Sequence, residues 1–353
     1  MKSERPRVLI TGASSGVGRA TALAFARRGW AVALIARGRP GLDATAREVE
    51  SLGGESLVLP LDVADAEAVQ AAAERVASAW GGIDVWINNA MATIFGSVES
   101  ITPAEFRRVT EVTYLGQVHG TLAALKQMRR QHAGTIVQVG SALAYRSIPL
   151  QSAYCGAKAA ARGFTDSLRS ELIHEKSPIR LTIVHLPAIN TPQFDWARTR
   201  LPRRLQPVPP IHAPEVAAEA IFKASLQVPR ELWVGSPTIK AILGTMLLPR
   251  FLDGLAARRA WDGQMMSEPS EARPDNLFEP RPGPSDGRGR FASAERHAVV
   301  ASDAAARGAF VGMGALLIAV LTLLARASVR RLVSRSRVPA GQHHLDTRGL
   351  RSR

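Results

Sequence analysis

Two side chains in the middle of the chain, Tyr154 and Lys158, have the types and spacing for proton transfer. A free tyrosine has a pKa of about 10, which is too high for an efficient base at neutral pH. A cation within about 4–6 Å favours the phenolate and lowers that pKa. Residues four apart share one face of a helix, and residues 153–175 have a helical pattern, so we expect Lys158 to tune Tyr154. The alternative is an ordinary surface contact between the two.

A glycine-rich stretch near the start of the chain, TGASSGVG from Thr11 to Gly18, follows a short apolar run and precedes a helical pattern. Glycines at such a junction allow a tight turn, close approach to a pyrophosphate and close packing of helix on strand. The first turn of the helix then offers free N–H groups and its positive dipole end to the anion. The loop therefore predicts dinucleotide binding by Gly12, Ser14, Ser15, Gly16, Val17 and Gly18.

The end of the second expected strand bears on the choice of dinucleotide. An acidic residue there would bind the ribose 2′-hydroxyl of NAD and repel a 2′-phosphate. The chain has Arg37 instead, and a guanidinium can pair with a phosphate through two parallel hydrogen bonds. We therefore expect NADP(H), with NAD(H) as the alternative cofactor and a solvated loop arginine as the alternative role of Arg37.

The elements that must position these residues alternate in type along the first two thirds of the chain. Short apolar or β-branched runs predict strands at residues 7–11, 31–36, 57–61, 84–88, 135–139, 180–185 and 231–234. Helical patterns lie between them at residues 19–28, 42–52, 66–79, 103–130, 153–175 and 214–225. This alternation predicts an α/β fold, a Rossmann-like doubly wound parallel sheet of seven strands.

The combination of motifs resembles the short-chain dehydrogenase/reductase family. The glycine loop has that family's spacing, Tyr154-Cys-Gly-Ala-Lys158 has its YxxxK pattern, and Ser141 stands at its catalytic serine position. The resemblance implies an NADP(H)-dependent oxidoreductase in which Ser141 holds the substrate oxygen, Tyr154 is the general acid/base and Lys158 also binds the nicotinamide ribose. By the same resemblance, further cofactor contacts are expected from Asp62, Val63, Asn89, Ala90, Ile189 and Thr191.

Three positions depart from the family pattern. Thr113 stands where the family has a fourth catalytic residue, an asparagine, and its hydroxyl has a shorter reach than an amide. Met91 and Ala188 replace family glycines. We expect altered rather than absent activity, with Thr113 as a candidate catalytic residue. The alternatives are a non-catalytic, cofactor-binding regulatory protein and an epimerase or dehydratase.

The last third of the chain has a different composition. We expect a catalytic domain at residues 1–240 and a helical extension at 241–266. A Pro/Gly-rich linker at 267–305, a membrane helix at 306–326 and a basic tail at 327–353 are expected to follow. No residue from Ala309 to Ala325 is charged, and a helix of that length reaches the short end of what crosses a bilayer. The alternatives for this segment are a buried helix, a self-association helix and a helix lying in the membrane interface.

The net charge of +15 comes partly from arginines in the tail. The chain has neither aromatic residues interleaved with the basic ones nor the sequence signature of a nucleic-acid-binding module. The single cysteine, Cys155, permits no intramolecular disulfide, and the histidines have no metal-ligand spacing. No secretory signal opens the chain, so we expect a cytoplasmic catalytic domain associated with a membrane. The apolar, proline-rich stretch at residues 192–214 predicts a substrate lid and a lipophilic carbonyl or alcohol substrate, and the family resemblance implies a homo-oligomer.

Overall fold

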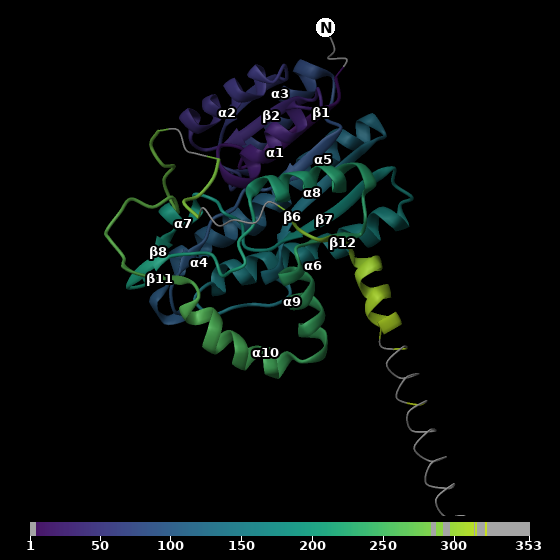
Figure 1. The fold of residues 1–353 in the computed structure, drawn as a ribbon. Helices are drawn as coiled ribbons and strands as arrows, with labels where there is room; N and C mark the ends of the chain where they lie inside the picture. Colours follow the sequence, from purple (N-terminus) through teal and green to yellow (C-terminus); the bar gives the residue numbers. More distant parts are fainter. Residues whose placement is uncertain (1–4, 284–286, 292–296, 314, 316–321, 323–353) are drawn as a thin grey trace, which may run out of the picture. The chain divides into compact units, whose positions relative to one another are not determined.

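A mainly parallel sheet of eight strands organises the chain in this computed structural model, which describes residues 5–283, 287–291, 297–313, 315 and 322. The strand order is β12-β10-β7-β6-β4-β1-β2-β3, and only the edge strand β12 is antiparallel to its neighbour (Figure 1). The seven parallel strands are β1 (Arg7–Thr11), β2 (Ala31–Ala36), β3 (Glu55–Pro60), β4 (Val85–Asn88), β6 (Gly134–Ser141), β7 (Ile179–Leu186) and β10 (Glu231–Val234). The predicted Rossmann-like parallel sheet is confirmed, and β12 (Val300–Ser302) is an addition to it.

Helices cover both faces of the sheet because alternate residues of each strand point to opposite sides. In β1, Val8 and Ile10 pack with α1, α2 and α8, whereas Leu9 packs in the cluster formed with α3, α5 and α6. The helices are α1 (Gly16–Ala26), α2 (Arg39–Ser51), α3 (Ala66–Trp80), α4 (Pro103–Thr110), α5 (Gly116–Gln131), α6 (Ser152–His174), α7 (Gln193–Trp196), α8 (Pro214–Gln227), α9 (Ser236–Leu247) and α10 (Pro249–Leu255). Shorter helical elements are η1 (Val98–Ser100), η2 (Glu111–Leu115), η3 (Ala142–Ala144) and η4 (Ala256–Ala260). Two small sheets lie outside the main one: β5 (Ile94–Phe95) pairs with β8 (Arg198–Thr199), and β9 (Arg203–Leu205) pairs with β11 (Met265–Pro269).

Local sequence sets where the helices begin and end. The Asp65 side chain accepts a hydrogen bond from the backbone N–H of Ala68 at the start of α3, which then ends at Gly81 with φ of 86°. Thr102 and Glu105 form a capping box before α4. The predicted helix at residues 103–130 is broken into α4 and α5 by the π-turn η2, which changes the direction in which residues 111–115 present their side chains.

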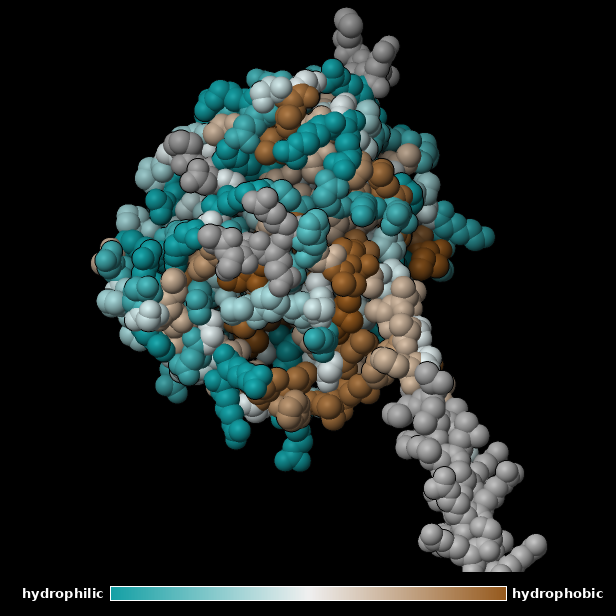
Figure 2. Space-filling model, viewed as in Figure 1, coloured by the Kyte–Doolittle hydropathy of each residue, from teal (hydrophilic) through white to brown (hydrophobic). Residues whose placement is uncertain are grey.

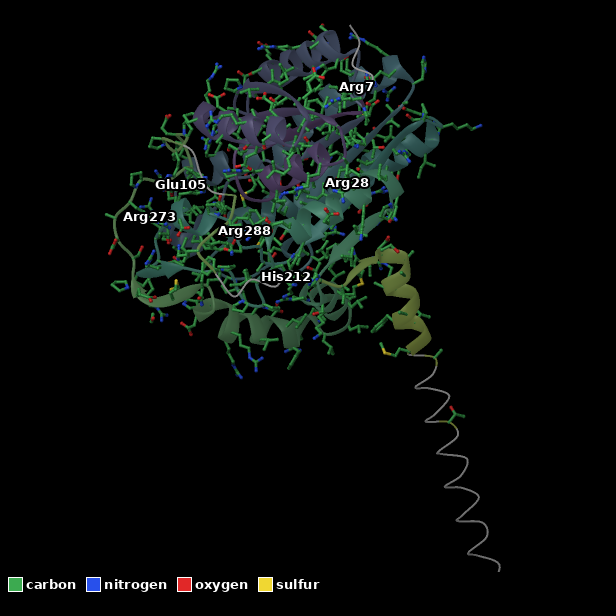
Figure 3. The ribbon with its side chains drawn as sticks, turned by 45° about the horizontal axis from the view of Figure 1, so that its top comes forward. Arg7, Arg28, Glu105, His212, Arg273 and Arg288 are labelled. Carbon is green, nitrogen blue, oxygen red and sulfur yellow. The ribbon has the colours of Figure 1, made fainter. Side chains whose placement is uncertain are left out.

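Residues 270–291, which we call the strap, return from β11 across the carboxyl edge of the sheet. Their described parts, residues 270–283 and 287–291, are tied to the body of the protein along their length. Arg273 donates to the carbonyl oxygens of Phe194 and Ala197, and Arg288 pairs with Glu215 at 2.9 Å; Figure 3 labels these two arginines of the strap.

The strap differs from the linker expected at residues 267–305. Leu277 is completely buried in the core cluster on the α3 side of the sheet. The last residues of β11 and the whole of β12 also fall within the expected linker. Proline and glycine remove local regularity, but arginine–carbonyl hydrogen bonds and one buried leucine supply tertiary order that composition does not reveal.

The extended C-terminal region forms a separate unit from Ala304 onward, in which residues 304–313 are helical. Among the residues that the structure describes, no helix is both long and apolar enough to span a bilayer. The predicted membrane helix at residues 306–326 extends beyond the described residues, and the basic tail at residues 327–353 lies outside them. Membrane association through this segment and the homo-oligomer stay predictions.

Leu277→Ala tests whether the strap contributes to the folded core. Because the wild-type side chain is fully buried, we expect the substitution to lower the free energy of unfolding by about 2–5 kcal/mol. Phe278→Ala is the matched control, because its ring is 42% exposed and should contribute no more than about 1 kcal/mol. Chemical denaturation followed by circular dichroism measures both. Equal, small effects would mean that the strap behaves as a linker.

Candidate active site

A cavity of about 480 Å³ lies where the parallel strands end, between the glycine loop and the N-terminal half of α6. Every predicted site residue except Thr113 contributes to its lining. The lining includes the loop residues Gly12, Ser14, Ser15, Gly16, Val17 and Gly18, the trio Ser141, Tyr154 and Lys158, and also Arg37, Asp62, Val63, Asn89, Ala90, Ile189 and Thr191. Residues from seven separate stretches of sequence therefore meet at one edge of the sheet, where folds of this type bind ligands.

The backbone of the glycine loop packs so closely at Gly12 and Gly18 that neither position has room for a side chain. A Cβ atom on Gly18 would lie 2.1 Å from the carbonyl oxygen of Gly12, and Gly12 itself has φ of 70°. The amide of Asn89 donates to the carbonyl of Thr11 at 3.0 Å, and the Thr11 hydroxyl accepts from the backbone N–H of Asn89 at 2.9 Å. The ends of β1 and β4 are thus fastened together beside the first turn of α1.

Ser141, Tyr154 and Lys158 come from β6 and α6. Lys158 is 2% exposed, and its Nζ donates to the carbonyl of Val139 at 2.7 Å. The same Nζ lies 5.8 Å from the centre of the Tyr154 ring, so the lysine and the tyrosine share one helix face as the spacing predicts. The backbone N–H of Leu143 donates to the Ser141 hydroxyl at 3.1 Å, which fixes the serine at the end of β6.

The electrostatics of this pair differ from the sequence expectation. Burial raises the pKa of Tyr154 above its usual range, while the Ser141 hydroxyl acts in the opposite direction. Burial also lowers the pKa of Lys158 to about 7. In the protein without a ligand, Lys158 therefore does not lower the pKa of Tyr154 as expected, because desolvation opposes the charged form of each group. The tyrosine is held as a phenol at neutral pH.

Thr113 does not line the cavity. It lies fully buried in the π-turn η2, where its hydroxyl donates to the carbonyl of Ala92 at 2.8 Å and accepts from the N–H of the same residue at 2.9 Å. Both hydrogen-bonding functions of the hydroxyl are used by one backbone unit. In this structure the Thr113 side chain fastens the segment after β4 and is absent from the cavity lining, so a catalytic role for Thr113 stays a prediction that the geometry does not support.

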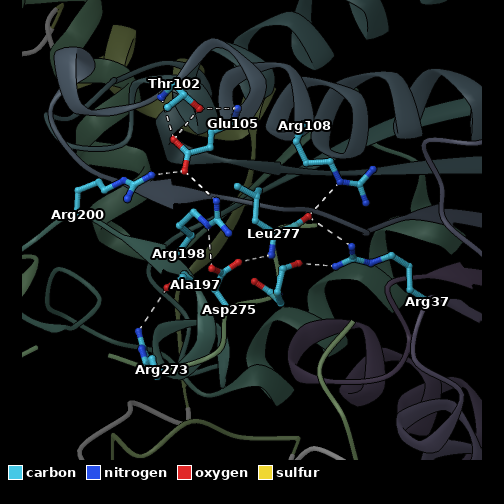
Figure 4. A network of polar contacts seen from close by, with 11 residues as sticks. Arg37, Thr102, Glu105, Arg108, Ala197, Arg198, Arg200, Arg273, Asp275 and Leu277 are labelled. Carbon is cyan, nitrogen blue, oxygen red and sulfur yellow. Dashed lines mark hydrogen bonds and ion pairs between the residues drawn. The ribbon is translucent and has the colours of Figure 1, made fainter. Parts of the chain in front are cut away.

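Arg37 lies at the cavity wall but binds the strap. Its guanidinium donates to the carbonyl oxygens of Asn276, Leu277 and Phe278, the last at 2.7 Å. Figure 4 shows the contact between Arg37 and Leu277. Arg108 donates to the same Leu277 carbonyl at 3.0 Å and also pairs with Asp62. Burial lowers the pKa of Arg37, and the charge of Asp62 acts against this effect. The two arginines thus close one end of the cavity with backbone that is remote in sequence.

The expected lid at residues 192–214 lines the cavity through Phe194 and Trp196. It is tied to α4, because Glu105, which is 2% exposed, accepts from Arg198 at 3.0 Å and from Arg200 at 2.6 Å (Figure 4). The capping glutamate of α4 therefore also anchors the strand β8. The proline content of this stretch predicted a loop over the site. The ion pairs that hold the loop could be identified only in the folded structure.

Several lining residues were not predicted from the sequence. They belong to the strap and to α9, both C-terminal to the motifs: Pro237, Thr238, Ala241, Asn276, Pro280, Arg281 and Gly283. The one sequence signal available for the strap was the apolar pair at Leu277 and Phe278 within a polar, proline-rich stretch. The strap passes so close to the segment after β7 that a Cβ on Gly289 would lie 2.5 Å from the carbonyl oxygen of Thr191.

A buried polar cluster lies behind the end of β6. His185 Nδ1 is 3.0 Å from the carbonyl oxygen of Ser141, and His185 Nε2 is 3.4 Å from the carboxylate of Glu231. Burial opposes the charge on Glu231, but the neighbouring His185 and the hydrogen bonds from Trp233 and from the hydroxyl of Tyr145 hold its pKa well below the usual range. Gly140 makes room for the imidazole, since a Cβ there would lie 2.8 Å from His185 Nδ1.

Comparison with known proteins gives one consistent result. The sequence profile of the family described as "short chain dehydrogenase" matches residues 6–200. The "Uncharacterized oxidoreductase YxnA" of Bacillus subtilis (strain 168) is 33% identical over 275 residues, covering 77% of each chain. The "Putative oxidoreductase SadH" of Mycobacterium tuberculosis (strain H37Rv) is 35% identical over 224 residues, 60% of this chain and 80% of that protein.

Solved structures agree with this result. The alcohol dehydrogenase of the archaeon Thermococcus sibiricus, in complex with 5-hydroxy-NADP, has a TM-score of 0.56 and 30% identity, covering 65% of this chain and 96% of that one. A metagenomic short-chain oxidoreductase in complex with NADP has a TM-score of 0.53 and 25% identity, covering 62% of this chain and 90% of that one.

The lowered pKa of Lys158 predicts a pH dependence of stability. Between pH of about 7 and the ordinary lysine value of 10.5, the unfolded chain holds a proton on Lys158 that the folded protein lacks, so folding stability rises with pH. In Lys158→Met this contribution is absent. We expect the unfolding free energy of the wild type, minus that of the variant, to increase by roughly 1 kcal/mol per pH unit across this window in cofactor-free protein.

Urea denaturation of both proteins at a series of pH values measures this difference, and titrations elsewhere in the chain cancel in it. A difference that stays constant with pH would show that Lys158 keeps its charge in the folded protein.

Proposed function

Since this chain belongs to the short-chain dehydrogenase/reductase family, we propose that it is an oxidoreductase that transfers a hydride between NADP(H) and a carbonyl or alcohol carbon of a lipophilic small molecule. One observation carries this proposal: Ser141, Tyr154 and Lys158 line the same cavity as the glycine loop. A proton donor and an anion-binding loop in one cavity are the two parts that such a reaction requires.

The donor set of the cavity fits a dinucleotide. The loop brings the start of α1, a helix of 11 residues, to the cavity, where its free N–H groups face inward, and the space beside Gly12 and Gly18 admits no side chain. Asp62, Val63 and Arg37 all line the cavity, and under this proposal Asp62 and Val63 contact the adenine. When bound, the nicotinamide supplies or accepts the hydride.

Two features support NADP(H) over NAD(H). No acidic residue stands at the end of β2, where Arg37 begins the loop, and Arg281 of the strap also lines the cavity. Both similar solved structures described above hold NADP or a derivative of it. Arg37 has to serve two partners under this proposal, because its guanidinium also donates to the strap carbonyls.

Ser141, Tyr154 and Lys158 each have a different role in the proton transfer. The Ser141 hydroxyl holds the substrate oxygen, and Tyr154, which keeps its proton at neutral pH, donates that proton as the oxygen gains negative charge. Lys158 lies beside the phenol, and in its protonated form, which is populated near and below its lowered pKa of about 7, it stabilises the phenolate that remains. In the oxidation direction Tyr154 takes the proton back.

The cavity wall supports a lipophilic substrate. Apart from the cofactor side, its lining is rich in apolar side chains: Phe95, Leu143, Ile148, Phe194, Trp196, Val208 and Pro209. Burial of apolar substrate surface against such a wall is worth roughly 25 cal/mol per Å². The amides of Gln151, Gln193 and Gln206 also line the cavity and can orient a polar group of the substrate.

A second candidate is a regulatory protein that binds the dinucleotide without catalysis. The observation in its favour is the commitment of the Thr113 hydroxyl to Ala92, which leaves that position without a side chain for a proton relay. The phenol of Tyr154 has no purpose in such a protein.

Tyr154→Phe separates the two candidates. The variant keeps the ring but lacks the proton, so we expect NADPH-dependent reduction of lipophilic carbonyls to fall about 10²–10⁴-fold while NADPH binding is retained. Tyr114→Phe is the matched control, because Tyr114 lies in η2 away from the cavity lining and should keep full activity. Steady-state absorbance of NADPH gives the rate, and fluorescence titration gives binding. Unchanged turnover in Tyr154→Phe would remove the catalytic assignment.

Arg37→Ala tests the cofactor preference. Loss of a charge-assisted hydrogen bond to a 2′-phosphate should weaken NADPH binding about tenfold or more relative to NADH. A loosened strap weakens both cofactors alike, so the ratio of the two dissociation constants isolates the phosphate contact. Arg39→Ala serves as control, since Arg39 is solvent-exposed beside Asp43. An unchanged ratio in Arg37→Ala would contradict the role of Arg37.

A further inference from the structure

Helices α9 and α10, with the following turn, leave a group of large apolar side chains in solvent. Figure 2 shows hydrophobic residues gathered along these two helices at the lower edge of the view. Only Thr238 and Ile242 of α9 are buried, and no residue of α10 is. The exposed members, which we call the docking face, are Met246, Leu247, Leu248, Phe251 and Trp261, with exposures between 44% and 65%. Contiguous exposed apolar patches commonly mark the sites at which a protein binds another surface.

Basic side chains surround the docking face. Lys240, Arg250, Arg258 and Arg259 are all exposed, and no ion pair joins them to an acid within the part of the chain that the structure describes. The two acids of the same segment are already paired: Asp253 with Arg146, and Asp262 with Arg203. The face therefore combines apolar area with uncompensated positive charge.

The docking face is continuous with the cavity wall through α9. Pro237, Thr238 and Ala241 in the first half of this helix line the cavity, whereas Met246 and Leu247 at its end are exposed. One helix thus connects the inside of the candidate active site to the apolar outer surface.

We propose that the docking face binds the surface of a bilayer that contains anionic lipids, with Leu248 and Phe251 inserted below the headgroups and the basic side chains among the phosphates. A helix with aromatic and aliphatic residues on one face and arginines beside them has the composition of an interfacial segment. Trp261 suits the headgroup level, where amphipathic rings accumulate. Such binding requires no membrane-spanning helix.

The charges favour a lipid surface over a second copy of this chain. In a two-fold contact the same face meets itself, so Arg250, Arg258 and Arg259 would face a surface that carries the same arginines. Like charges brought together in this way oppose association, and the face itself has no unpaired acid to offset them. Anionic lipid headgroups supply the negative charge that the docking face lacks.

The consequence for the active site rests on the proposed function. A lipophilic substrate dissolves in the bilayer, and docking through α9 would place the cavity next to that reservoir. Binding of the face itself is independent of catalysis, so the two parts can be tested separately.

An environment-sensitive fluorophore on Phe251→Cys in the full chain measures docking directly. The native Cys155 is buried and is replaced by serine in all variants. With phosphatidylcholine–phosphatidylglycerol vesicles, we expect a blue-shifted emission that a lipid-attached quencher suppresses, and little change with phosphatidylcholine alone. The control label at Ser51→Cys, exposed at the end of α2, should not respond. The label reports on its own position, so anchoring by residues 306–326 cannot imitate docking. An unresponsive label at position 251 would overturn the proposal.

The double variant Leu248→Ser/Phe251→Ser connects docking to substrate access. We expect its partition onto anionic vesicles through this face, measured with the label moved to Leu247→Cys, to fall about tenfold or more. Its rate with a water-soluble carbonyl should equal that of the wild type, while its rate with a carbonyl dissolved in vesicles should fall. Absence of activity in the wild type would contradict the proposed function but not docking. Concentration-dependent self-association of the wild type, lost in the double variant and without vesicle binding, would show that copies of the chain occupy the face.

Discussion

The close approach of helix α1 to the end of strand β1 is the constraint on which the rest of the site depends. The backbone at Gly12 and Gly18 leaves no room for a side chain, and the first turn of α1 is thereby brought to the cavity. Thr11 and Asn89 then join the ends of β1 and β4, and β6 lies next to β4 in the sheet. Ser141 follows from β6, and α6 returns with Tyr154 and Lys158. The glycine loop and the Ser141, Tyr154 and Lys158 trio are therefore parts of one backbone arrangement rather than two separate sites.

The sequence predicted those features that local chemistry decides. Continuous apolar runs such as residues 31–36 predicted the parallel strands, and glycine spacing predicted the loop. It did not predict that desolvation would raise the pKa of Tyr154, because burial depends on the whole fold. Thr113 was placed correctly in its helix but not oriented, since the π-turn η2 changes the side-chain direction and has no signature in the sequence.

The strap shows why composition alone was misleading in the last third of the chain. Proline-rich and glycine-rich segments lack periodicity, and their order depends on partners that are remote in sequence. Here those partners are Arg37 and Arg108, which bind strap carbonyls, and Arg198, which binds Asp275 at 2.8 Å. Part of the basic character that first raised the question of nucleic acid is thus used inside the protein, as hydrogen-bond donors to its own backbone and carboxylates.

The missing side chain at Gly140 has a consequence for how this protein can change over time. Its neighbour on β7, His185, fills the space in which a Cβ would stand, so the two positions share one volume across adjacent strands. Alanine at position 140 would therefore require a smaller or displaced side chain at position 185. The carboxylate of Glu231 would keep its hydrogen bonds from Tyr145 and Trp233, so the volume shared by positions 140 and 185 is what couples their side-chain sizes.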